Sequence, residues 1–290
     1  MFRRPVRLSP LSRSASLPHR RNSENGLLRG CRAVLSTENI TAVRILDRSG
    51  VRAAAEAFRQ IVEGLGDFRI AACHNIAVKE PMVDEAGAIL ASEVFGWTME
   101  ENDRWWHSPR IALDSPLPGA CRYVNDPFWA SARGIRTHQS NLFLEKIDLS
   151  NFEARAITKA AIVAPVHLPF GQVGAVSFTL RDQSRDDLSE EFARFGDELG
   201  IYARTFVSSY VPVMCRAQRL PAGSKLSKRE VECLRWAAIG KTDYEISAII
   251  SRSRATVRFH IHNASIKLDA VNRSQTVFKA AQLGYIGLNS

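Results

Sequence analysis

The chain has 290 residues, of which 45% are hydrophobic, and a formal net charge of +9 at pH 7. This length usually corresponds to two domains, and no apolar run approaches the roughly 18 residues that a membrane-spanning helix needs. The five Cys are widely scattered without a CxxC pair, which argues against a zinc site or a disulfide framework, and their odd number fits a reducing cytoplasm.

The charge is unevenly distributed along the chain. Residues 1–35 carry eight Arg and one Glu, residues 36–215 carry 18 basic against 24 acidic residues, and residues 216–290 carry 13 against five. A basic C-terminal block on an acidic body fits DNA binding by one end of the chain. The Arg- and Ser-rich residues 1–35 have the composition of a transit peptide, of a disordered tail or of sequence before the true start codon. We interpret them as a disordered or artefactual extension.

Residues 36–212 mix helical and strand patterns. Residues 51–65 and 187–210 carry apolar side chains at near-helical spacing and predict two amphipathic helices. Residues 68–78, 162–168 and 173–180 predict strands, the last two joined by a hairpin turn at residues 169–172. This order predicts an α/β/α sandwich with a central antiparallel sheet. Residues 213–225, which contain Pro221-Ala222-Gly223-Ser224, are interpreted as a linker.

Aromatic residues are concentrated between residues 95 and 129, where four of the chain's five Trp lie together with Asp114 and Asp126. Aromatic side chains with a few carboxylates can line a small-molecule pocket. They can equally form an aromatic-rich core, and the spacing favours neither.

Residues 226–290 carry the strongest helix signals. Ser227–Glu230 and Thr242–Glu245 are two capping boxes, and a third helix start follows at Ser253. Helices are predicted over residues 228–239, 243–250, 254–268 and 274–283, with Gly240 as a C-cap. The predicted inward faces are Val231, Leu234, Trp236, Ala238 and Ile239; Ile246, Ile249 and Ile250; Val257, Ile261, Ala264 and Leu268; and Val277, Phe278 and Ala281.

The opposite face of the third helix is the candidate DNA-reading surface. Arg258 and His262 are four residues apart and therefore adjacent on that face, and Arg can form two hydrogen bonds to guanine in the major groove. On an isolated helix, this would be an ordinary solvated basic face. Within three closely spaced helices, it indicates a helix-turn-helix unit and an all-α C-terminal domain over residues 226–290.

At these positions the chain resembles the C-terminal DNA-binding domain of LuxR-type transcription regulators. The matching residues are Glu230, Leu234, Gly240, Lys241, Thr242, Glu245, Ile246, Thr256, Val257, Phe259, His260, Lys267, Leu268, Asn272 and Arg273. The resemblance implies that Arg258 and His262 read bases in double-stranded DNA. It also implies phosphate contacts around them, and the predicted DNA-binding set is Lys241, Thr242, Arg254, Thr256, Arg258, His262, Ser265 and Arg273.

Two departures from this family lie in the turn before the third helix. Ser251 and Arg252 stand where the family usually has Gly and an aliphatic residue. A Ser in a left-handed conformation costs about 1 kcal/mol relative to Gly. We expect Arg252 to point outward as a further phosphate contact, in a weakened but intact domain.

LuxR-type regulators often carry an N-terminal domain that binds acyl-homoserine lactones, and residues 36–212 share part of its pattern. Asp114 and Trp129 have the family's Asp–Trp separation, although the Pro follows one position late. Glu101 stands where the family has a lactone-binding Trp, and Ala161 replaces a Gly. The resemblance implies that Asp114 accepts a hydrogen bond from a ligand amide. The predicted ligand site is Trp97, Trp105, Asp114, Phe128 and Trp129.

No catalytic or metal-binding group is apparent. Cys73 and His74, for example, are adjacent in a predicted strand and should point to opposite faces. The first hypothesis is a homodimeric regulator, not an enzyme and without a cofactor. It would bind a palindromic operator and respond to an acyl-homoserine lactone or another small apolar ligand, with RNA polymerase as a candidate partner. The alternative is a ligand-independent regulator that forms a heterodimer with a related protein.

Overall fold

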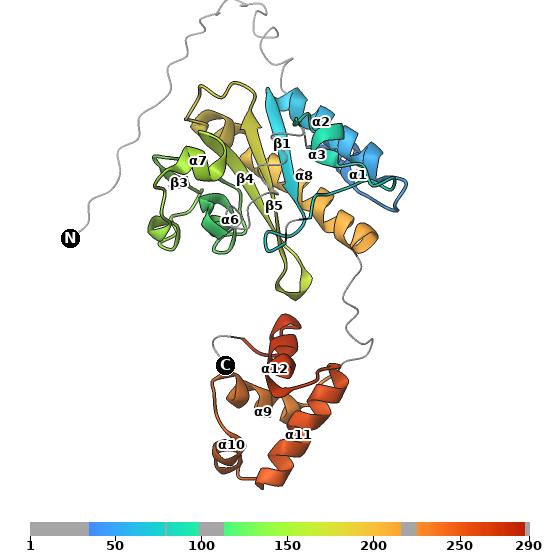
Figure 1. Cartoon of the computed structure of the whole chain (residues 1–290), viewed down its shortest axis with the longest axis vertical. Coiled ribbons are helices and arrows are strands. Elements are labelled where there is room, and N and C mark those ends of the chain that lie inside the picture. The colour runs from blue at the N-terminus through green and yellow to red at the C-terminus, as the bar shows by residue number, and fades with distance from the viewer. Residues whose placement is uncertain (1–34, 79, 99–112, 216–224, 288–290) are drawn as a thin grey trace, which may run out of the picture. The chain divides into compact units, whose positions relative to one another are not determined.

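The computed structural model describes residues 35–78, 80–98, 113–215 and 225–287 (Figure 1). The first three ranges build a mixed helix-and-sheet assembly, and the last builds an all-helical segment. Residues 1–34 of the predicted extension and residues 216–224 of the predicted linker lie outside the described residues. Of the helices that are described, none is both long and apolar enough to cross a bilayer.

A five-stranded antiparallel sheet forms the centre of residues 35–215 (Figure 1). Its strands, in the order β1-β5-β4-β2-β3, are β1 (Phe68–Cys73), β5 (Val173–Leu180), β4 (Ala160–His167), β2 (Phe128–Ser131) and β3 (Gly134–Arg136). The predicted hairpin is confirmed, because β4 and β5 pair directly across the short helix η2 (Pro169–Gly171). The strand predicted over residues 68–78 ends earlier, since the Asn75 side chain accepts a hydrogen bond from the Ala77 amide and turns the chain.

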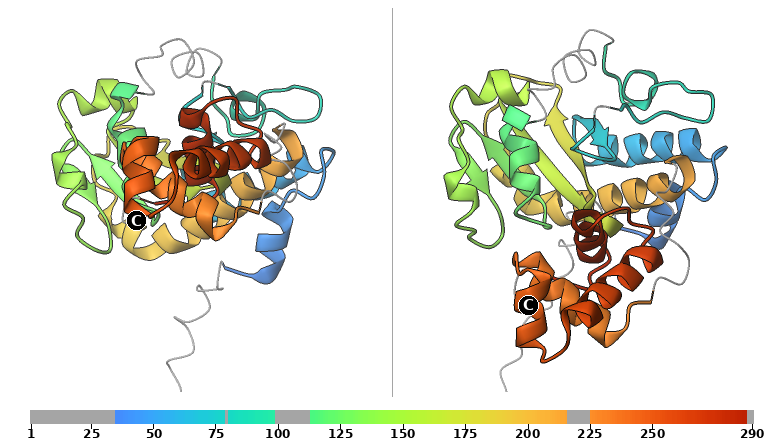
Figure 2. Two further views of the ribbon diagram at one scale, coloured as in Figure 1. Left: turned by 90° about the horizontal axis from the view of Figure 1, so that it is seen from below. Right: turned by 60° about the horizontal axis from the view of Figure 1, so that its bottom comes forward.

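Helices α2 (Val51–Leu65) and α8 (Ser189–Met214) cover one face of the sheet, and α1 (Thr37–Val43) packs against both of them. Helices α2 and α8 lie side by side along this face (Figure 2). Phe58 of α2 packs edge-on against Phe178 of β5, with ring centroids 6.0 Å apart, and lies 5.3 Å from the ring of Phe206 on α8. Both predicted amphipathic helices are confirmed, and α8 continues past the predicted end of the helix into the first residues of the predicted linker.

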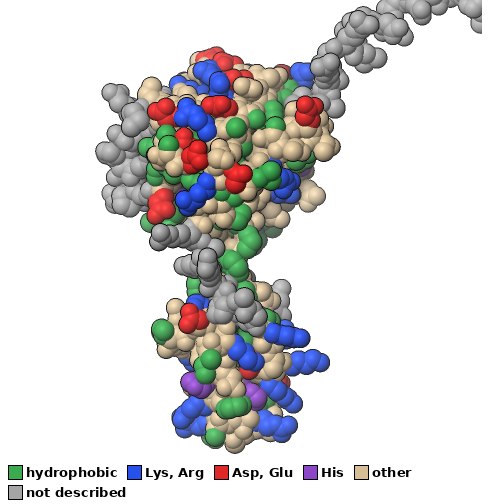
Figure 3. All heavy atoms as spheres, turned by 90° about the vertical axis from the view of Figure 1, so that its right-hand side faces the viewer, with side chains coloured by type: hydrophobic (Ala, Val, Ile, Leu, Met, Phe, Trp, Pro, Cys, Tyr) green, Lys and Arg blue, Asp and Glu red, His purple; other side chains and the backbone are tan. Residues whose placement is uncertain are grey.

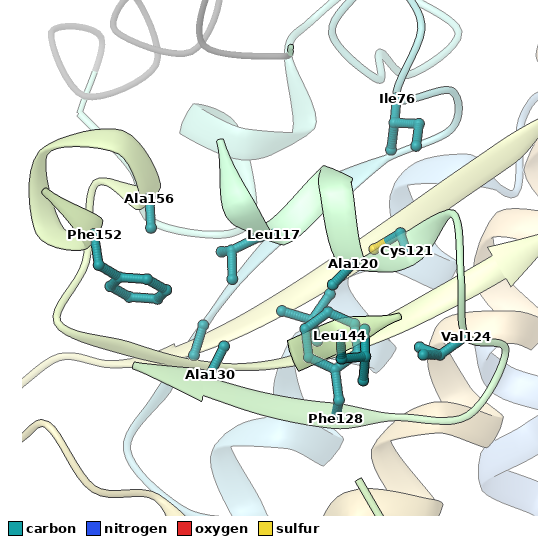
Figure 4. Close-up of a cluster of buried hydrophobic side chains, with 12 residues drawn as sticks. Ile76, Leu117, Ala120, Cys121, Val124, Phe128, Ala130, Leu144, Phe152 and Ala156 are labelled. Carbon is teal, nitrogen blue, oxygen red and sulfur yellow. The ribbon is translucent and has the colours of Figure 1, made fainter. Parts of the chain in front are cut away.

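The other face of the sheet carries α6 (Pro116–Cys121), η1 (Leu144–Lys146) and α7 (Phe152–Ala156). These elements enclose a second apolar core, in which Leu117 and Cys121 pack with Phe128 of β2 (Figure 4). The short helix α3 (Leu90–Glu93) lies next to β1. Helices on both faces of an antiparallel sheet confirm the predicted sandwich.

Residues 225–287 form four helices, as predicted: α9 (Lys228–Ala238), α10 (Asp243–Ile249), α11 (Arg254–Lys267) and α12 (Arg273–Gln282). Both capping boxes are present, because the Ser227 and Thr242 hydroxyls each accept a hydrogen bond from the amide of the Glu three residues on. Gly240 follows α9 with a φ of 89°, a left-handed conformation that a glycine adopts without steric cost.

The predicted inward faces are confirmed for α11 and partly wrong elsewhere. Ile239 is 56% exposed because α9 ends one residue before it. Ile250, the residue that caps the end of α10, packs with the buried Ile246, whereas Ile249 is 43% exposed. Phe278 is 60% exposed and Ala281 is also exposed. The buried face of α12 instead contains Thr276, Val277, Ala280 and Leu283.

The turn between α10 and α11 has the geometry that the sequence predicted. Ser251 adopts a φ of 52°, the left-handed region in which a side chain is strained. Arg252 is exposed, as expected, and its guanidinium donates to the Ser251 carbonyl at 3.2 Å. The domain therefore accommodates both departures without losing a helix.

Candidate nucleic-acid interface and ligand pocket

Helix α11 has one buried and one charged face. Val257 and Ile261 are buried among residues of α9 and α10, and Ala264 is buried among residues of α9 and α12. The N-terminus of the helix is fixed by Ser253, whose hydroxyl accepts a hydrogen bond from the Thr256 amide at 3.1 Å. On the other face Arg254, Arg258 and His262 are exposed, as the sequence predicted. Lys and Arg side chains gather along one side of this segment (Figure 3).

Thr256 and Ser265 lie at the edges of this surface and are half-buried. The Thr256 hydroxyl is 2.9 Å from the hydroxyl of Ser253, and the Ser265 hydroxyl donates to the carbonyl of His262 at 2.7 Å. Both hydroxyls therefore already have a partner within α11 or its cap, so a DNA phosphate would have to compete with these local hydrogen bonds.

Lys241 and Thr242 precede α10 and converge on Glu245. The Glu245 carboxylate accepts hydrogen bonds from the Thr242 amide at 2.8 Å and from the Lys241 ammonium at 3.2 Å. The backbone and hydroxyl donors of Thr242, followed by Lys241, lower the pKa of Glu245 to about 2. Glu245 is thus ionised at neutral pH, and it offsets part of the positive charge of Lys241.

Arg273 lies at the first position of α12 and has an internal role that the sequence did not indicate. Its guanidinium bonds to the Asp243 carboxylate and donates to the Lys241 carbonyl at 2.8 Å. These contacts join the start of α12 to the start of α10. Arg273 was predicted to contact a DNA phosphate, but in this structure its guanidinium forms hydrogen bonds with Asp243 and Lys241 of the same domain.

A second ion pair joins α9 to the end of α11. The Lys267 ammonium lies 2.8 Å from both carboxylate oxygens of Glu230, which is 3% exposed. Burial alone would raise the pKa of Glu230, but the Lys267 ammonium and the Ser227 amide outweigh burial and lower it. Glu230 therefore caps α9 and anchors α11 with the same carboxylate.

The structure describes Trp97, Asp114, Phe128 and Trp129 of the predicted ligand site, and these four residues do not converge on one pocket. Trp97 uses its indole N–H to donate to the Ile70 carbonyl at 2.6 Å, and its ring lies 4.9 Å below the Arg69 guanidinium. Because β1 is an edge strand, this bond satisfies a carbonyl that has no neighbouring strand. Trp97 thus closes the edge of the sheet, while Trp105 lies outside the described residues.

Phe128 and Trp129 are consecutive on β2 and point to opposite faces of the sheet. Phe128 pairs with Val163 and is fully buried in the core beneath α6. Trp129 pairs with Ile162, and Ile162 pairs with Phe178 on the face that α8 covers. Directly paired residues share a face, so Phe128 and Trp129 cannot line the same side of one pocket. Side chains alternate along a strand, and the assignment of Phe128 and Trp129 to a ligand site stays a prediction.

Asp114, the predicted acceptor for a ligand amide, is exposed and lies just before α6. Its backbone carbonyl accepts a hydrogen bond from the Arg155 guanidinium at 2.7 Å, which joins the segment to α7. The role of Asp114 as an acceptor for a ligand amide stays a prediction. Ala161, at the family's Gly position, is fully buried on β4, whereas Glu101 lies outside the described residues.

Two hollows lie among the described parts of residues 35–215. One of about 490 Å³ lies between β3 and η1, and another of about 400 Å³ lies between the end of α2 and the start of α8. Neither is lined by a residue of the predicted ligand site.

Burial raises the pKa of the Cys73 thiol to about 11, so Cys73 stays protonated and is a poor nucleophile at neutral pH.

Comparison with known proteins places the all-helical segment in a family. Residues 224–280 match the model of the bacterial regulatory proteins of the luxR family. This part of the chain belongs to the luxR family.

Curated relatives extend the match beyond the luxR-family domain. The chain is 36% identical over 136 residues to the transcriptional activator protein VanR of Vibrio anguillarum, covering 44% of this chain and 52% of VanR. It is 45% identical over 89 residues to the quorum sensing-dependent transcriptional regulator RpaR of Rhodopseudomonas palustris, covering 30% and 37%. The chain thus spans about half the length of the curated relatives it matches.

A solved structure of Escherichia coli SdiA aligns with 86% of this chain and 96% of its own, with a TM-score of 0.48 and 22% identity.

The luxR-family domain contains two residues whose roles sequence reasoning missed. Glu230 and Asp243 were identified only as helix-start residues, yet their partners Lys267 and Arg273 lie 37 and 30 positions along the chain. The capping box reveals the first function of Glu230 but not its second partner, and the position of Asp243 in the first turn of α10 does not indicate Arg273.

Proposed function

We propose that the chain is a transcription regulator that binds double-stranded DNA through its luxR-family domain. The observation that carries this proposal is the exposed face of α11, where Arg258 and His262 lie free of the helical core in a helix-turn-helix frame. Arg258 and His262 would read base edges in the major groove, with Arg254 and Lys241 nearer the phosphates. Domain boundaries at residues 36–212 and 226–290 belong to this proposal.

The regulator would act as a homodimer on a palindromic operator. Two copies of α11 would enter successive major grooves of half-sites about 10 base pairs apart, centre to centre. Helices α8 and α12 would provide the contacts between protomers, and RNA polymerase would be a further partner at the promoter. The exposed Phe278 on α12 favours this arrangement, because a large exposed apolar side chain gains from being covered.

Residues 36–212 would sense a small signal molecule, an acyl-homoserine lactone or a similar apolar ligand. This part of the proposal is supported by the relatives whose names describe quorum sensing-dependent regulators. Within this chain, Asp114 remains the candidate acceptor for a ligand amide. Because the Asp114 side chain is exposed, ligand binding would have to be accompanied by burial of this side chain.

One observation favours a second candidate, the ligand-independent regulator that forms a heterodimer. The core beneath α6 is filled by the chain's own side chains, including Phe128 and Phe152, which are both at most 2% exposed. A core filled by the protein's own residues requires no ligand for its stability. In that case the sandwich would serve dimerisation alone.

DNA binding is tested by selecting duplexes from a pool of randomised palindromes with the full-length protein. We expect one sequence to be enriched, and Arg258→Ala to lose the preference for it over a scrambled duplex. Arg229→Ala is the matched control, because Arg229 is paired with Glu232 on α9. No enriched sequence, or an unchanged preference in Arg258→Ala, would overturn the proposal.

The sensing role is tested by thermal melting and mass spectrometry after growth with a panel of acyl-homoserine lactones. One stoichiometric lactone that raises the melting temperature supports the sensor, and Asp114→Ala should then reduce the affinity about tenfold or more. A folded protein with no bound molecule and no thermal shift supports the ligand-independent candidate.

A further inference from the structure

The Asp243 carboxylate lies between two arginines that come from different helices. Its Oδ1 atom accepts a hydrogen bond from Nη1 of Arg273 on α12. Its Oδ2 atom lies 3.8 Å from Nε of Arg258 on α11. One carboxylate on α10 is therefore shared by a structural arginine and by the arginine that we assign to base reading.

Asp243 is held firmly, whereas Arg258 is not. The Arg273 guanidinium that holds Asp243 also donates to the Lys241 carbonyl at 2.8 Å, one residue before the N-cap Thr242. The Asp243 side chain is 20% exposed, but that of Arg258 is 67% exposed. The carboxylate is thus a fixed point beside a long side chain that is otherwise free in solvent.

We propose that Asp243 is a positioning residue for Arg258. A distance of 3.8 Å is too long for a hydrogen bond but within reach of electrostatic attraction. Such a loose tether limits the orientations of the free guanidinium without occupying its hydrogen-bond donors. Arg258 therefore loses less conformational freedom when it binds a base edge.

The same contact reduces binding to the wrong DNA. An unpaired arginine binds any phosphate, which adds affinity without sequence information. Asp243 offsets part of this charge in the free protein, so Arg258 gains most where a guanine offers two acceptors in the right geometry. Asp243 would thereby raise the ratio of specific to non-specific affinity.

This inference rests on the proposed DNA-binding function, and a double-mutant cycle separates the two. The probes are the duplex that the wild-type protein enriches and a scrambled duplex of the same composition. The proteins are full-length wild type, Asp243→Asn, Arg258→Ala and the double variant. Asp243→Asn retains an oxygen for Arg273 but removes the charge that attracts Arg258.

We expect Asp243→Asn to lower the specificity ratio about fivefold in the wild-type background and to leave it unchanged in the Arg258→Ala background. Asp269→Asn is the matched control, because it removes an exposed negative charge two residues after the end of α11, far along the chain from Arg258. An equal effect of Asp243→Asn in both backgrounds, or no effect in either, would overturn the positioning role. If no duplex is enriched by the wild-type protein, the proposed function fails first.

Thermal melting shows whether Asp243→Asn remains folded. If it does not, Asp243→Glu keeps the charge for Arg273 while displacing it by one methylene. We then expect a lower specificity ratio with an unchanged salt dependence of binding. A wild-type ratio in Asp243→Glu would contradict the proposal.

Discussion

The ammonium of Lys267 lies 2.8 Å from both carboxylate oxygens of Glu230, although 37 residues separate them in the chain. Glu230 is almost fully buried and also accepts a hydrogen bond from the Ser227 amide at 2.6 Å. The pair closes the bundle by joining the start of α9 to the end of α11. Its strength therefore bears on the stability of the whole luxR-family domain.

Glu230→Gln should lower the free energy of unfolding by about 1–2 kcal/mol at pH 7, because a buried charge-assisted hydrogen bond is lost. The folded-state pKa of Glu230 is depressed below 4.5, so its contribution is present above pH 4.5 and lost as the pH falls through the lowered pKa. Urea unfolding from pH 7 to pH 3 measures this. Glu232→Gln, which alters only an exposed pair, should change stability by less than about 0.5 kcal/mol.

Ser251→Gly should raise the free energy of unfolding by about 0.5–1 kcal/mol. Ser251 has a φ of 52°, a conformation in which glycine avoids the steric cost of a side chain. Ser253→Ala, two positions later, should have the opposite sign, since it removes the N-cap of α11 and costs about 1 kcal/mol. Two variants with the same sign in urea unfolding would contradict the strain at Ser251.

Arg252→Ala should weaken binding to any DNA duplex while preserving the preference for the enriched one. The residue is exposed in the turn just before α11, and a phosphate contact carries no sequence information. We expect the slope of log affinity against log salt to decrease by about one unit. An unchanged slope in fluorescence anisotropy titrations would show that Arg252 does not contact phosphate.

Phe128→Ala should lower the free energy of unfolding by about 3–4 kcal/mol, because a fully buried aromatic ring leaves a cavity beneath α6. Trp129→Ala should cost less, since this side chain is partly exposed on the other face. If the sandwich binds a ligand under α6, only the Phe128 variant should change the ligand-induced thermal shift. A shift change in Trp129→Ala alone would place the ligand on the α8 side.

The parts of the fold that the sequence predicted well depend on neighbouring residues. The capping boxes at Ser227 and Thr242 satisfy backbone donors within one turn, so a hydroxyl and a Glu three residues on suffice to locate α9 and α10. The hairpin of β4 and β5 is likewise local, because two apolar runs flank one short turn. Errors such as Ile239 arose where a pattern continued one residue beyond the helix end.

The candidate ligand site depends on relationships that act over a longer range. Its five residues were taken from an aromatic-rich stretch and from a family resemblance, and neither reports which face of a sheet a residue occupies. Trp97 was predicted to line a pocket. In the structure its indole N–H donates to the carbonyl of Ile70, which lies on the edge strand β1 and far from Trp97 in the sequence. The indole N–H is satisfied by that backbone, which no local pattern could indicate.

The sequence by itself determined the helical domain, its caps and the exposed basic face of α11, because periodicity and capping act within a few residues. Only the tertiary structure decided that Glu230 holds Lys267, that Arg273 holds Asp243, and that Phe128 and Trp129 lie on opposite sides of the sheet. These relationships join residues from different elements. Their geometry follows from how helices and strands pack, and packing depends on the whole chain at once.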